Sequence, residues 1–384
     1  MTTRPLYRAA YRFWFPTAMI FLINGVAFGA WAALIPRATA RLQVDEGTFG
    51  LMLLAMGIGA VLAMAFSGRL IARFGAAPLM RLSLAVFLAS YIVLSVSSNP
   101  GVFVAALLLF GAAGGLMDVA MNAYAADVEA HMDWRVMASF HGMWSVGGLI
   151  GAAAVATMLA LVSDLTQALI LDGCLILLFF ACQHLLVPLR QHAGGTASRK
   201  FSINRVSLIL AILAAICFSA EGAVRDWSSL YLTKEVQTSI DRGGWAYAAF
   251  SAAMAVCRLS GDWLRLRFGE QRVIIASCAA AILGYMIAVL LDQQLLIIAG
   301  FALVGVGLSN IVPILISAAG RGDAPGSAIA FVVTFGYAGF LASPPILGFI
   351  ASQSSLATMF LFVMASCFLI AAGWAMIERR EKRV

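Results

Sequence analysis

Three charged residues stand close together in an otherwise apolar stretch of the sequence. Glu221, Arg225 and Asp226 fall in the run that begins near Val206. On a helix, Glu221 and Arg225 are four residues apart and can pair, whereas Asp226 is rotated by about 140° from Glu221. Burial and a nearby arginine act in opposite directions on the pKa of a carboxyl group. The spacing therefore predicts an acid able to couple a proton to another process.

A second interpretation of these charges is structural. Glu221 and Arg225 would form a self-neutralised ion pair at a helix end, and Asp226 would simply lie in water. The sequence alone leaves both interpretations open.

A second polar set lies in the first half of the chain. Asp118 is about ten residues, or roughly 15 Å, from the expected cytoplasmic end of its apolar stretch, near the middle of a membrane span. Asn122 follows one helical turn later on the same face. Counting residues along neighbouring stretches predicts one polar pocket, formed by Asn24, Asp118, Asn122, His141, Trp144 and Ser145.

Each member of this pocket also has a structural interpretation. The amides of Asn24 and Asn122 can join helices through hydrogen bonds, and Trp144 can be ordinary packing. His141 can cap polar contacts near the cytoplasmic end. Asp118 is harder to explain in this way, because an ionised carboxylate needs a cation and the nearby sequence offers only His141. We expect Asp172, near the outer end of its stretch, to be solvated at the interface.

The composition shows what must position these residues. Of 384 residues, 62% are hydrophobic and 11% are charged, whereas soluble domains carry about 25% charged residues. Spanning a membrane takes about 20 apolar residues per helix. The sequence predicts an all-α integral membrane protein with twelve spans, at residues 12–36, 48–72, 78–98, 101–127, 136–161, 166–189, 205–232, 243–266, 272–291, 294–318, 326–351 and 355–377.

Lysine and arginine placement predicts the orientation of the spans. The basic residues of the two termini, the central loop and alternate connections gather on one side, and the other side has only Arg37, Arg41, Lys234 and Arg242. Basic residues favour the cytoplasmic side, so we expect both termini there. The same asymmetry explains the net charge of +7 without nucleic acid.

Several classes of function are disfavoured by the motifs. The sequence has no P-loop, no zinc-binding helix motif and no nucleophile elbow. We expect no enzyme activity, no metal and no cofactor.

The two halves of the chain resemble each other. "NGVAFGAWAAL" (24–34) matches "EGAVRDWSSL" (221–230), and "SGRLIARFG" (67–75) matches "SGDWLRLRFG" (260–269). "GLMD" (115–118) matches "GLSN" (307–310), and the spacing of Phe140, Trp144 and Gly148 matches that of Phe331, Phe335 and Gly339. The prediction is a six-helix bundle over 1–189, a cytoplasmic linker over 190–204 and a second bundle over 205–384.

Two six-helix halves, a basic central loop and a Gly–Arg loop after the second and eighth spans resemble the major facilitator superfamily. "NGVAFGAWAALIPR", "GGLMDVAMNAYAADVE", "SFHGMWSVGGLIGA" and "EGAVRDWSSLYL" are similar to its MosC-like branch. The resemblance implies two pseudo-symmetric bundles that give alternating access to a central site.

The Gly–Arg loops imply a cytoplasmic gate, but they depart from the usual pattern. The superfamily loop carries an acid four residues after its first glycine, where this chain has Ala72 and Arg265. Arg69 and Arg73 are kept, and the second copy places Asp262 four residues after Arg258. Asp127 or Glu129 could supply the missing carboxylate. Alternatively, these arginines only anchor the loop at the membrane surface.

Together these features predict a secondary transporter of the bacterial inner membrane for a small polar solute such as a sugar, polyol or amino-polyol. It is expected to be proton-coupled through Asp118, Glu221 and Asp226, and monomeric. The substrate-binding set adds Trp31, Glu221, Arg225 and Asn310 to the pocket of the first half. The alternatives are a proton-antiport exporter of amphipathic or cationic compounds, served by the seventeen methionines, and a membrane sensor that transports nothing.

Overall fold

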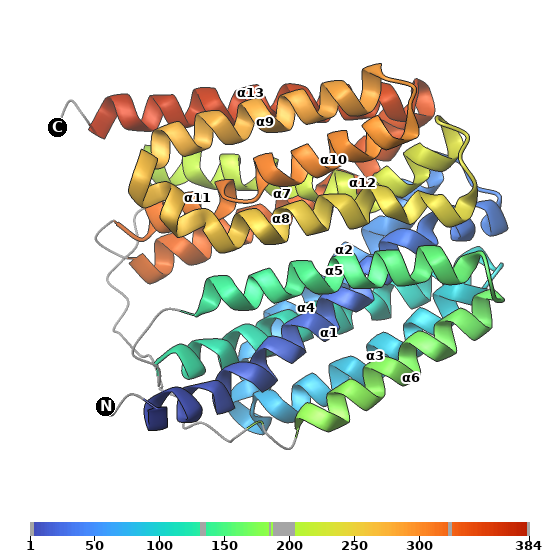
Figure 1. Ribbon diagram of the computed structural model, residues 1–384, viewed down its shortest axis with the longest axis horizontal. Coiled ribbons are helices and arrows are strands. Elements are labelled where there is room, and N and C mark those ends of the chain that lie inside the picture. Colours follow the sequence, from blue (N-terminus) through green and yellow to red (C-terminus); the bar gives the residue numbers. More distant parts are fainter. Residues whose placement is uncertain (1–3, 131–135, 184–185, 187–203, 322–324, 382–384) are drawn as a thin grey trace. The chain divides into compact units, whose positions relative to one another are not determined.

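The computed structural model describes residues 4–130, 136–183, 186, 204–321 and 325–381, and these residues form helices joined by short connections. The helices of Figure 1 are α1 (Arg4–Leu42), α2 (Glu46–Phe74), α3 (Ala76–Val96), α4 (Pro100–Ala130), α5 (Met137–Leu159), α6 (Asp164–Gln183), α7 (Arg205–Lys234), α8 (Ile240–Phe268), α9 (Glu270–Leu290), α10 (Gln294–Leu308), α11 (Ile311–Ala319), α12 (Pro325–Gln353) and α13 (Leu356–Glu381). The predicted all-α membrane class is confirmed.

The helices match the predicted spans, except that one predicted span is divided into two helices. In the described part of the chain, 11 helical spans are long and apolar enough to cross a membrane, and one of them, Gln294–Ala319, contains both α10 and α11. The helix α8 is also long enough, with 29 residues. Its sequence includes Asp241, Arg242, Arg258 and Arg265, and these charges lower its hydropathy.

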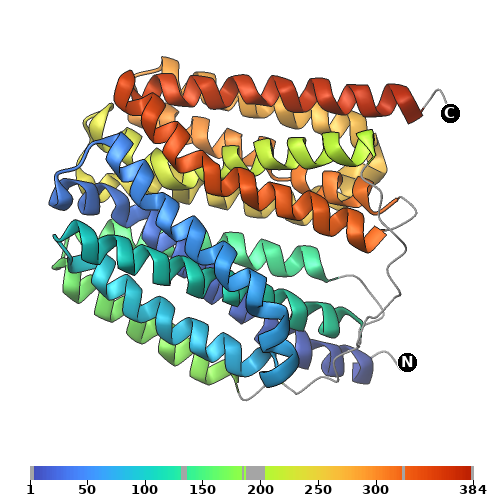
Figure 2. The same cartoon turned by 180° about the vertical axis from the view of Figure 1, so that it is seen from behind.

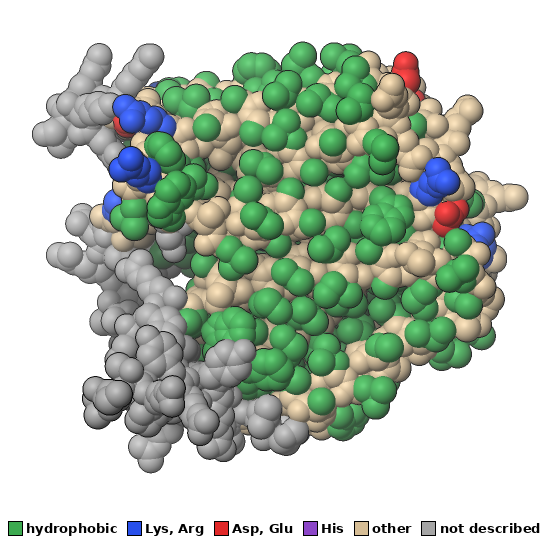
Figure 3. Space-filling view, viewed as in Figure 1, with side chains coloured by type: hydrophobic (Ala, Val, Ile, Leu, Met, Phe, Trp, Pro, Cys, Tyr) green, Lys and Arg blue, Asp and Glu red, His purple; other side chains and the backbone are tan. Residues whose placement is uncertain are grey.

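The outer surfaces of the helices suit a lipid environment. On the helices in view in Figure 3, hydrophobic side chains cover the middle and charged side chains lie near the ends. Large exposed hydrophobic residues include Leu62, Leu177, Phe180, Phe349 and Phe368. Apolar surface in water costs about 25 cal/mol per Å², so this surface is stable only against lipid.

The chain forms two compact units. Unit 1 comprises Met1–Val44, Met52–Ala193 and Ile240–Gly244, and unit 2 comprises Asp45–Leu51, Gly194–Ser239 and Trp245–Val384. The first turn of α2 is thus grouped with unit 2, although the rest of α2 belongs to unit 1. The first turn of α8 is grouped with unit 1, although the rest of α8 belongs to unit 2. The predicted linker at 190–204 lies outside the described residues except for Asn204.

The packing order within one unit repeats in the other. In unit 1, α1 packs against α5, and α3 packs against α4 and α6. In unit 2, α7 packs against α12, and α9 packs against α10 and α13. Figures 1 and 2 both show α3 beside α6 and α9 beside α13. The internal repeat in the sequence therefore corresponds to a repeat in helix packing.

Matching glycines form the turns after α2 and α8. Gly75 has φ 81° and Gly269 has φ 80°, a conformation that side chains other than glycine rarely adopt. Each glycine is the only residue between two helices, because α2 ends at Phe74 and α3 begins at Ala76, and α8 and α9 are joined likewise. The repeated "RFG" thus allows an abrupt reversal of the chain.

Side-chain caps fix where other helices begin. Asn204 and Ser207 form a reciprocal capping box at α7, with 2.8 Å from Ser207 N to Asn204 Oδ1. At α2, the backbone N–H of Thr48 donates to Asp45 Oδ1 at 2.7 Å. This hydrogen bond holds the pKa of the Asp45 carboxyl below its ordinary value.

Candidate functional site

In unit 1, the first polar pair of the candidate site joins α1 to α5. Trp144 Nε1 donates a hydrogen bond to Asn24 Oδ1 at 2.8 Å. The two helices approach closely here, because a Cβ atom on Gly25 of α1 or Gly147 of α5 would overlap the backbone of the facing helix. Asn24 is buried, and its Nδ2 has no hydrogen-bond partner among the described residues. The NH2 group of this amide therefore keeps both of its N–H donors available.

The second polar pair lies on α4. Asn122 Nδ2 donates to Asp118 Oδ1 at 3.1 Å and to the Asp118 carbonyl oxygen at 2.8 Å. Both side chains are half-buried. This is the same-face arrangement expected from their four-residue spacing. The amide stabilises the carboxyl oxygen by donating to it, without supplying a positive charge.

The other predicted members of the unit 1 pocket have local contacts. His141 is exposed and lies edge-on to Phe21 of α1, with 5.4 Å between ring centroids. Ser145 is buried and donates to the His141 carbonyl oxygen of its own helix at 3.3 Å. Trp31 is fully buried beside Phe103 and Phe110 of α4. The indole nitrogen of Trp31 has no hydrogen-bond partner among the described residues.

Aromatic rings lie next to the Asn24–Trp144 pair. Phe28 of α1 is 6.2 Å from Trp144 between ring centroids, 5.4 Å from Phe87 and 5.7 Å from Phe110. Gly114 of α4 leaves room for Phe28, because a Cβ atom there would lie 2.9 Å from the Phe28 ring. We call Phe28, Phe87, Phe110 and Trp144 the aromatic cluster of unit 1.

In unit 2, the charges of α7 form two ion pairs. Arg258 of α8 reaches Glu221 at 3.1 Å. Arg225 donates to Asp226 through Nε and Nη2, each at 2.8 Å. The short contacts of these charges are therefore one pair between helices and one pair between sequence neighbours, and Arg225 also acts electrostatically on Glu221. The sequence spacing missed Arg258 as a partner because it lies on another helix.

The Arg225–Asp226 pair is deeply buried. The side chains of Arg225 and Asp226 are 8% and 1% exposed, so the interpretation of Asp226 as a residue in water is wrong. The Arg225 guanidinium lies over the Phe340 ring of α12, 4.1 Å from its centroid. The two acids and two arginines balance in charge, which lowers the cost of burying them. Glu221 Oε1 has no hydrogen-bond partner among the described residues.

Asn310 lies where α10 gives way to α11. Its Nδ2 donates to the Cys257 carbonyl oxygen of α8 at 3.3 Å and to Ser309 Oγ at 3.1 Å. Its Oδ1 occupies the space over Gly261 that a Cβ atom would fill. Asn310 therefore connects α8 to this helix break, whereas Asp118, its partner in the repeat, lies inside a continuous α4.

The predicted gate residues have separate surroundings. Arg69 and Arg73 are exposed, and Arg73 lies over the ring of Phe74 at 5.1 Å. Asp127 is half-buried. Arg258 is the partner of Glu221, and the side chain of Asp262 lies outside the described part of the structure.

Glu129, the other acid considered for the loop, caps α5. Its Oε2 accepts hydrogen bonds from the backbone N–H groups of Val136 and Met137 at 2.6 and 2.9 Å. These donors lie at the start of α5, where backbone N–H groups lack partners within the helix.

The sequence interpretation missed Glu270. This acid follows Gly269 and pairs with Arg265 at 2.7 Å and with Arg321 at 2.8 Å. Arg265 also donates to Ser317 Oγ of α11 at 2.8 Å. Glu270 therefore joins the end of α8 to the end of α11. Its position directly after the repeated "RFG" was the available signal.

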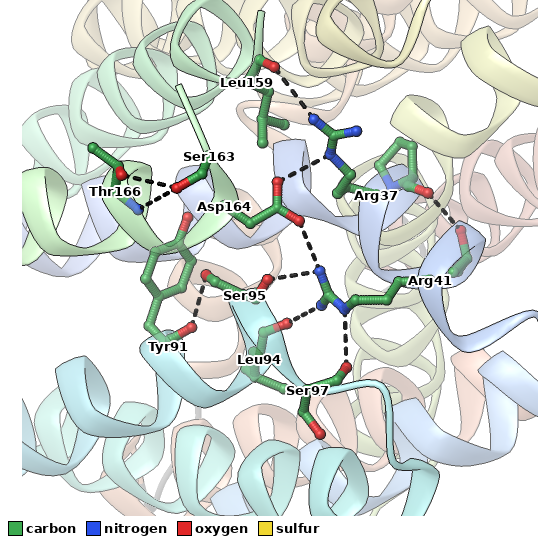
Figure 4. A network of polar contacts seen from close by, with 12 residues as sticks. Arg37, Arg41, Tyr91, Leu94, Ser95, Ser97, Leu159, Ser163, Asp164 and Thr166 are labelled. Atoms are coloured by element: carbon green, nitrogen blue, oxygen red, sulfur yellow. Dashed lines mark hydrogen bonds and ion pairs between the residues drawn. The ribbon is translucent and has the colours of Figure 1, made fainter. Parts of the chain in front are cut away.

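A second missed network joins the ends of four helices in unit 1 (Figure 4). Asp164, at the start of α6, pairs with Arg37 and Arg41 of α1, each at 3.0 Å. Arg41 also donates to the carbonyl oxygens of Leu94, Ser95 and Ser97 at 2.6, 2.6 and 2.9 Å. Arg37 donates to the Leu159 carbonyl oxygen at 3.4 Å. The two arginines thus bind the carboxyl ends of α3 and α5, where partial negative charge accumulates.

Asp172 differs from its prediction. It is 4% exposed, so the expected solvation at the interface is wrong. The side chain lies on the buried face of α6, together with Ala168, Leu171 and Leu175. Neither carboxyl oxygen has a hydrogen-bond partner among the described residues.

Comparisons with known proteins agree with this architecture. The model of the family described as the Major Facilitator Superfamily matches residues 17–223 and 209–384 of this chain. An uncharacterized MFS-type transporter of Yersinia pestis is 37% identical over 94% of this chain and 95% of the relative. The membrane protein MosC of Rhizobium meliloti is 32% identical over 95% of this chain and 90% of its own length.

Solved structures show the same fold. The nucleoside transporter NupG superimposes with a TM-score of 0.74 at 14% identity, over 95% of this chain and 99% of NupG. A bacterial homologue of the human lysosomal transporter Spinster gives 0.70 at 10% identity, over 98% of each chain. The chain belongs to the Major Facilitator Superfamily and is a multi-pass membrane transporter.

Proposed function

We propose that the chain is a secondary transporter for a small polar solute, coupled to protons and working by alternating access in the bacterial inner membrane. The observation that carries the proposal is the pair of buried ion pairs in unit 2, Glu221–Arg258 and Arg225–Asp226. Charged residues inside membrane spans are costly and are therefore expected to have a function. We also propose that the protein is a monomer.

Proton coupling needs an acid whose partner can change. Glu221 has one oxygen bonded to Arg258 and one without a partner among the described residues. A solute or water that draws Arg258 away would leave Glu221 as a buried carboxylate, which favours uptake of a proton. Asp226 is more firmly bound, since Arg225 holds both of its oxygens. We therefore assign the main coupling role in unit 2 to Glu221.

Asp118 is the corresponding acid of unit 1. It is half-buried and receives a neutral amide donor from Asn122. One of its described hydrogen bonds comes from an amide, whereas Glu221 is bound by an arginine. Each unit thus contributes one acid suited to proton exchange.

The polar groups indicate the chemistry of the solute. In unit 1, Asn24 retains a donor in Nδ2 and Asp118 supplies an acceptor. Hydroxyl groups both donate and accept, so a sugar, polyol or amino-polyol can satisfy such a set. Trp144, held by Asn24, offers a fixed ring face for stacking.

A second candidate function is proton-driven export of amphipathic cations. The aromatic cluster of unit 1 favours it, because Phe28 and Trp144 can bind a cation on their ring faces. The two candidates differ in ligand. Sugars and polyols would stabilise the purified protein under the first, and hydrophobic amines under the second.

The experiment is a thermal-shift screen of purified protein against sugars, polyols, amines and hydrophobic cations at two pH values. Any bound ligand raises the melting temperature by mass action. Proton coupling predicts that the stabilisation depends on pH and that this dependence is lost in E221Q. Stabilisation by hydrophobic cations alone would favour the exporter, and stabilisation independent of pH would contradict proton coupling.

A further inference from the structure

Asp172 is a buried acid that the proposed transport function does not use. Only 4% of its surface is exposed. Its neighbours on the same helix face, Ala168, Leu171 and Leu175, are apolar and cannot donate hydrogen bonds. In such surroundings an ionised carboxylate without a partner is strongly disfavoured.

The charged groups on the helices around Asp172 are already paired or distant. The helix α6 packs against α3, α1 and α5. From α1, Arg37 and Arg41 both bind Asp164 (Figure 4), about 12 Å along α6 from Asp172. The titratable residues at the far ends of α3 and α5 are Arg81 and His141, and both are exposed.

Tyr91 of α3 is the titratable group that faces Asp172 from a neighbouring helix. It interacts electrostatically with Asp172. Its hydroxyl already accepts a hydrogen bond from Gln167 at 2.9 Å. On α6 itself, the remaining titratable groups are Asp164, bound by the two arginines, Cys174 and Cys182. None of these groups supplies a positive charge to Asp172.

We propose that Asp172 is a proton-binding site of unit 1, separate from the Asn24–Trp144 and Asp118–Asn122 pairs. The carboxylate takes one proton from water and becomes a neutral carboxylic acid as α6 packs into the unit. It gives the proton back to water when the side chain is hydrated. The described residues contain no group of three or more histidine, cysteine, aspartate or glutamate side chains that could hold a metal ion. A proton is therefore the ligand that fits.

Infrared spectroscopy of the full-length protein in lipid nanodiscs tests the proposal. The difference spectrum between wild type and D172N at pH 7 should contain the carbonyl stretch of a protonated carboxylic acid. D292N is the matched control, because Asp292 is exposed and should give a carboxylate signal instead. A carboxylate signal from Asp172 at pH 7 without the carbonyl stretch of the protonated acid would overturn the proposal.

Thermal unfolding between pH 4 and pH 8 gives an independent measurement, because an unfolded chain releases the proton of an aspartate above a pH of about 4. Wild type should lose stability relative to D172N as the pH rises, by a few degrees in Tm, because only wild type must hold a proton. Stabilisation of wild type but not D172N by sodium at constant pH would assign the site to a metal ion instead. If D172N fails to fold, D172E takes its place in the infrared comparison, and a carboxylate signal from that glutamate without the carbonyl stretch of a protonated acid would overturn the proposal.

Discussion

Arg258 of α8 donates to Glu221 of α7 at 3.1 Å, so the charge of Glu221 is balanced from a neighbouring helix. Both side chains are largely buried, 14% and 17% exposed. A displacement between α7 and α8 would therefore change the partner of Glu221. This relationship connects a movement of helices to the protonation of one acid.

Breaking this pair from either side should destabilise the protein. E221Q and R258Q each remove the short ion pair between α7 and α8 in a largely buried setting, which should cost about 3 kcal/mol. The double variant removes both charges and should be less destabilised than the sum of the single variants. Unfolding of all three variants in the same detergent measures this coupling. Additive effects would show that the two residues do not interact.

The two arginines of the Asp164 network should differ in importance. R41A removes hydrogen bonds to three carbonyl oxygens and to Asp164, and should lower the free energy of unfolding by about 3 kcal/mol. R37A removes a partly exposed pair and should cost less than about 1 kcal/mol. Thermal unfolding of the two variants measures the difference, and equal losses would contradict the assigned geometry.

Gly261 should be intolerant of a side chain, unlike its counterpart in the first half of the chain. A Cβ atom at Gly261 would overlap Asn310 Oδ1, whereas nothing lies within 4 Å of a Cβ atom at Gly68. G261A should therefore lower the melting temperature and G68A should not. The N310A substitution should partly restore G261A, because it removes the overlapping atom. No difference between G261A and G68A would mean that Asn310 does not occupy this space.

The Asn24–Trp144 hydrogen bond should position the tryptophan ring. N24A leaves the indole N–H of Trp144 without its acceptor, and W144F keeps a ring but removes the donor. Each substitution should weaken ligand binding several-fold. The double variant should bind the ligand no more weakly than the single variant of lower affinity. Titration calorimetry with a ligand from the thermal-shift screen measures these affinities. Independent, additive losses would contradict a shared role.

The fold was largely predictable because lipid restricts the options to apolar helices of nearly fixed length. Twelve spans, the repeat and the family all followed from hydropathy and short motifs. The turns at Gly75 and Gly269 show how a repeated "RFG" fixes the same geometry twice. Hydropathy did not reveal the break at Ser309 and Asn310, because α10 and α11 are both apolar.

The side-chain partners were less predictable because most of them lie on other helices. The four-residue spacing on one helix correctly paired Asp118 with Asn122, but it did not reveal the hydrogen bonds from Arg225 to Asp226. Contacts such as Glu221–Arg258 and Asp164–Arg41 depend on helix rotation, which the sequence does not specify. Asp172 was misplaced for the same reason, since its depth was estimated without knowing which way its helix face turns.

The most direct test is uptake into proteoliposomes, driven by an imposed proton gradient, of a solute that stabilises the protein. Wild type and the exposed control D292N should show gradient-dependent flux. D118N and E221Q should insert into the membrane and bind solute, but their flux should be at least about tenfold lower. A tenfold change in rate corresponds to about 1.4 kcal/mol. Wild-type flux in both D118N and E221Q would contradict proton coupling through these acids.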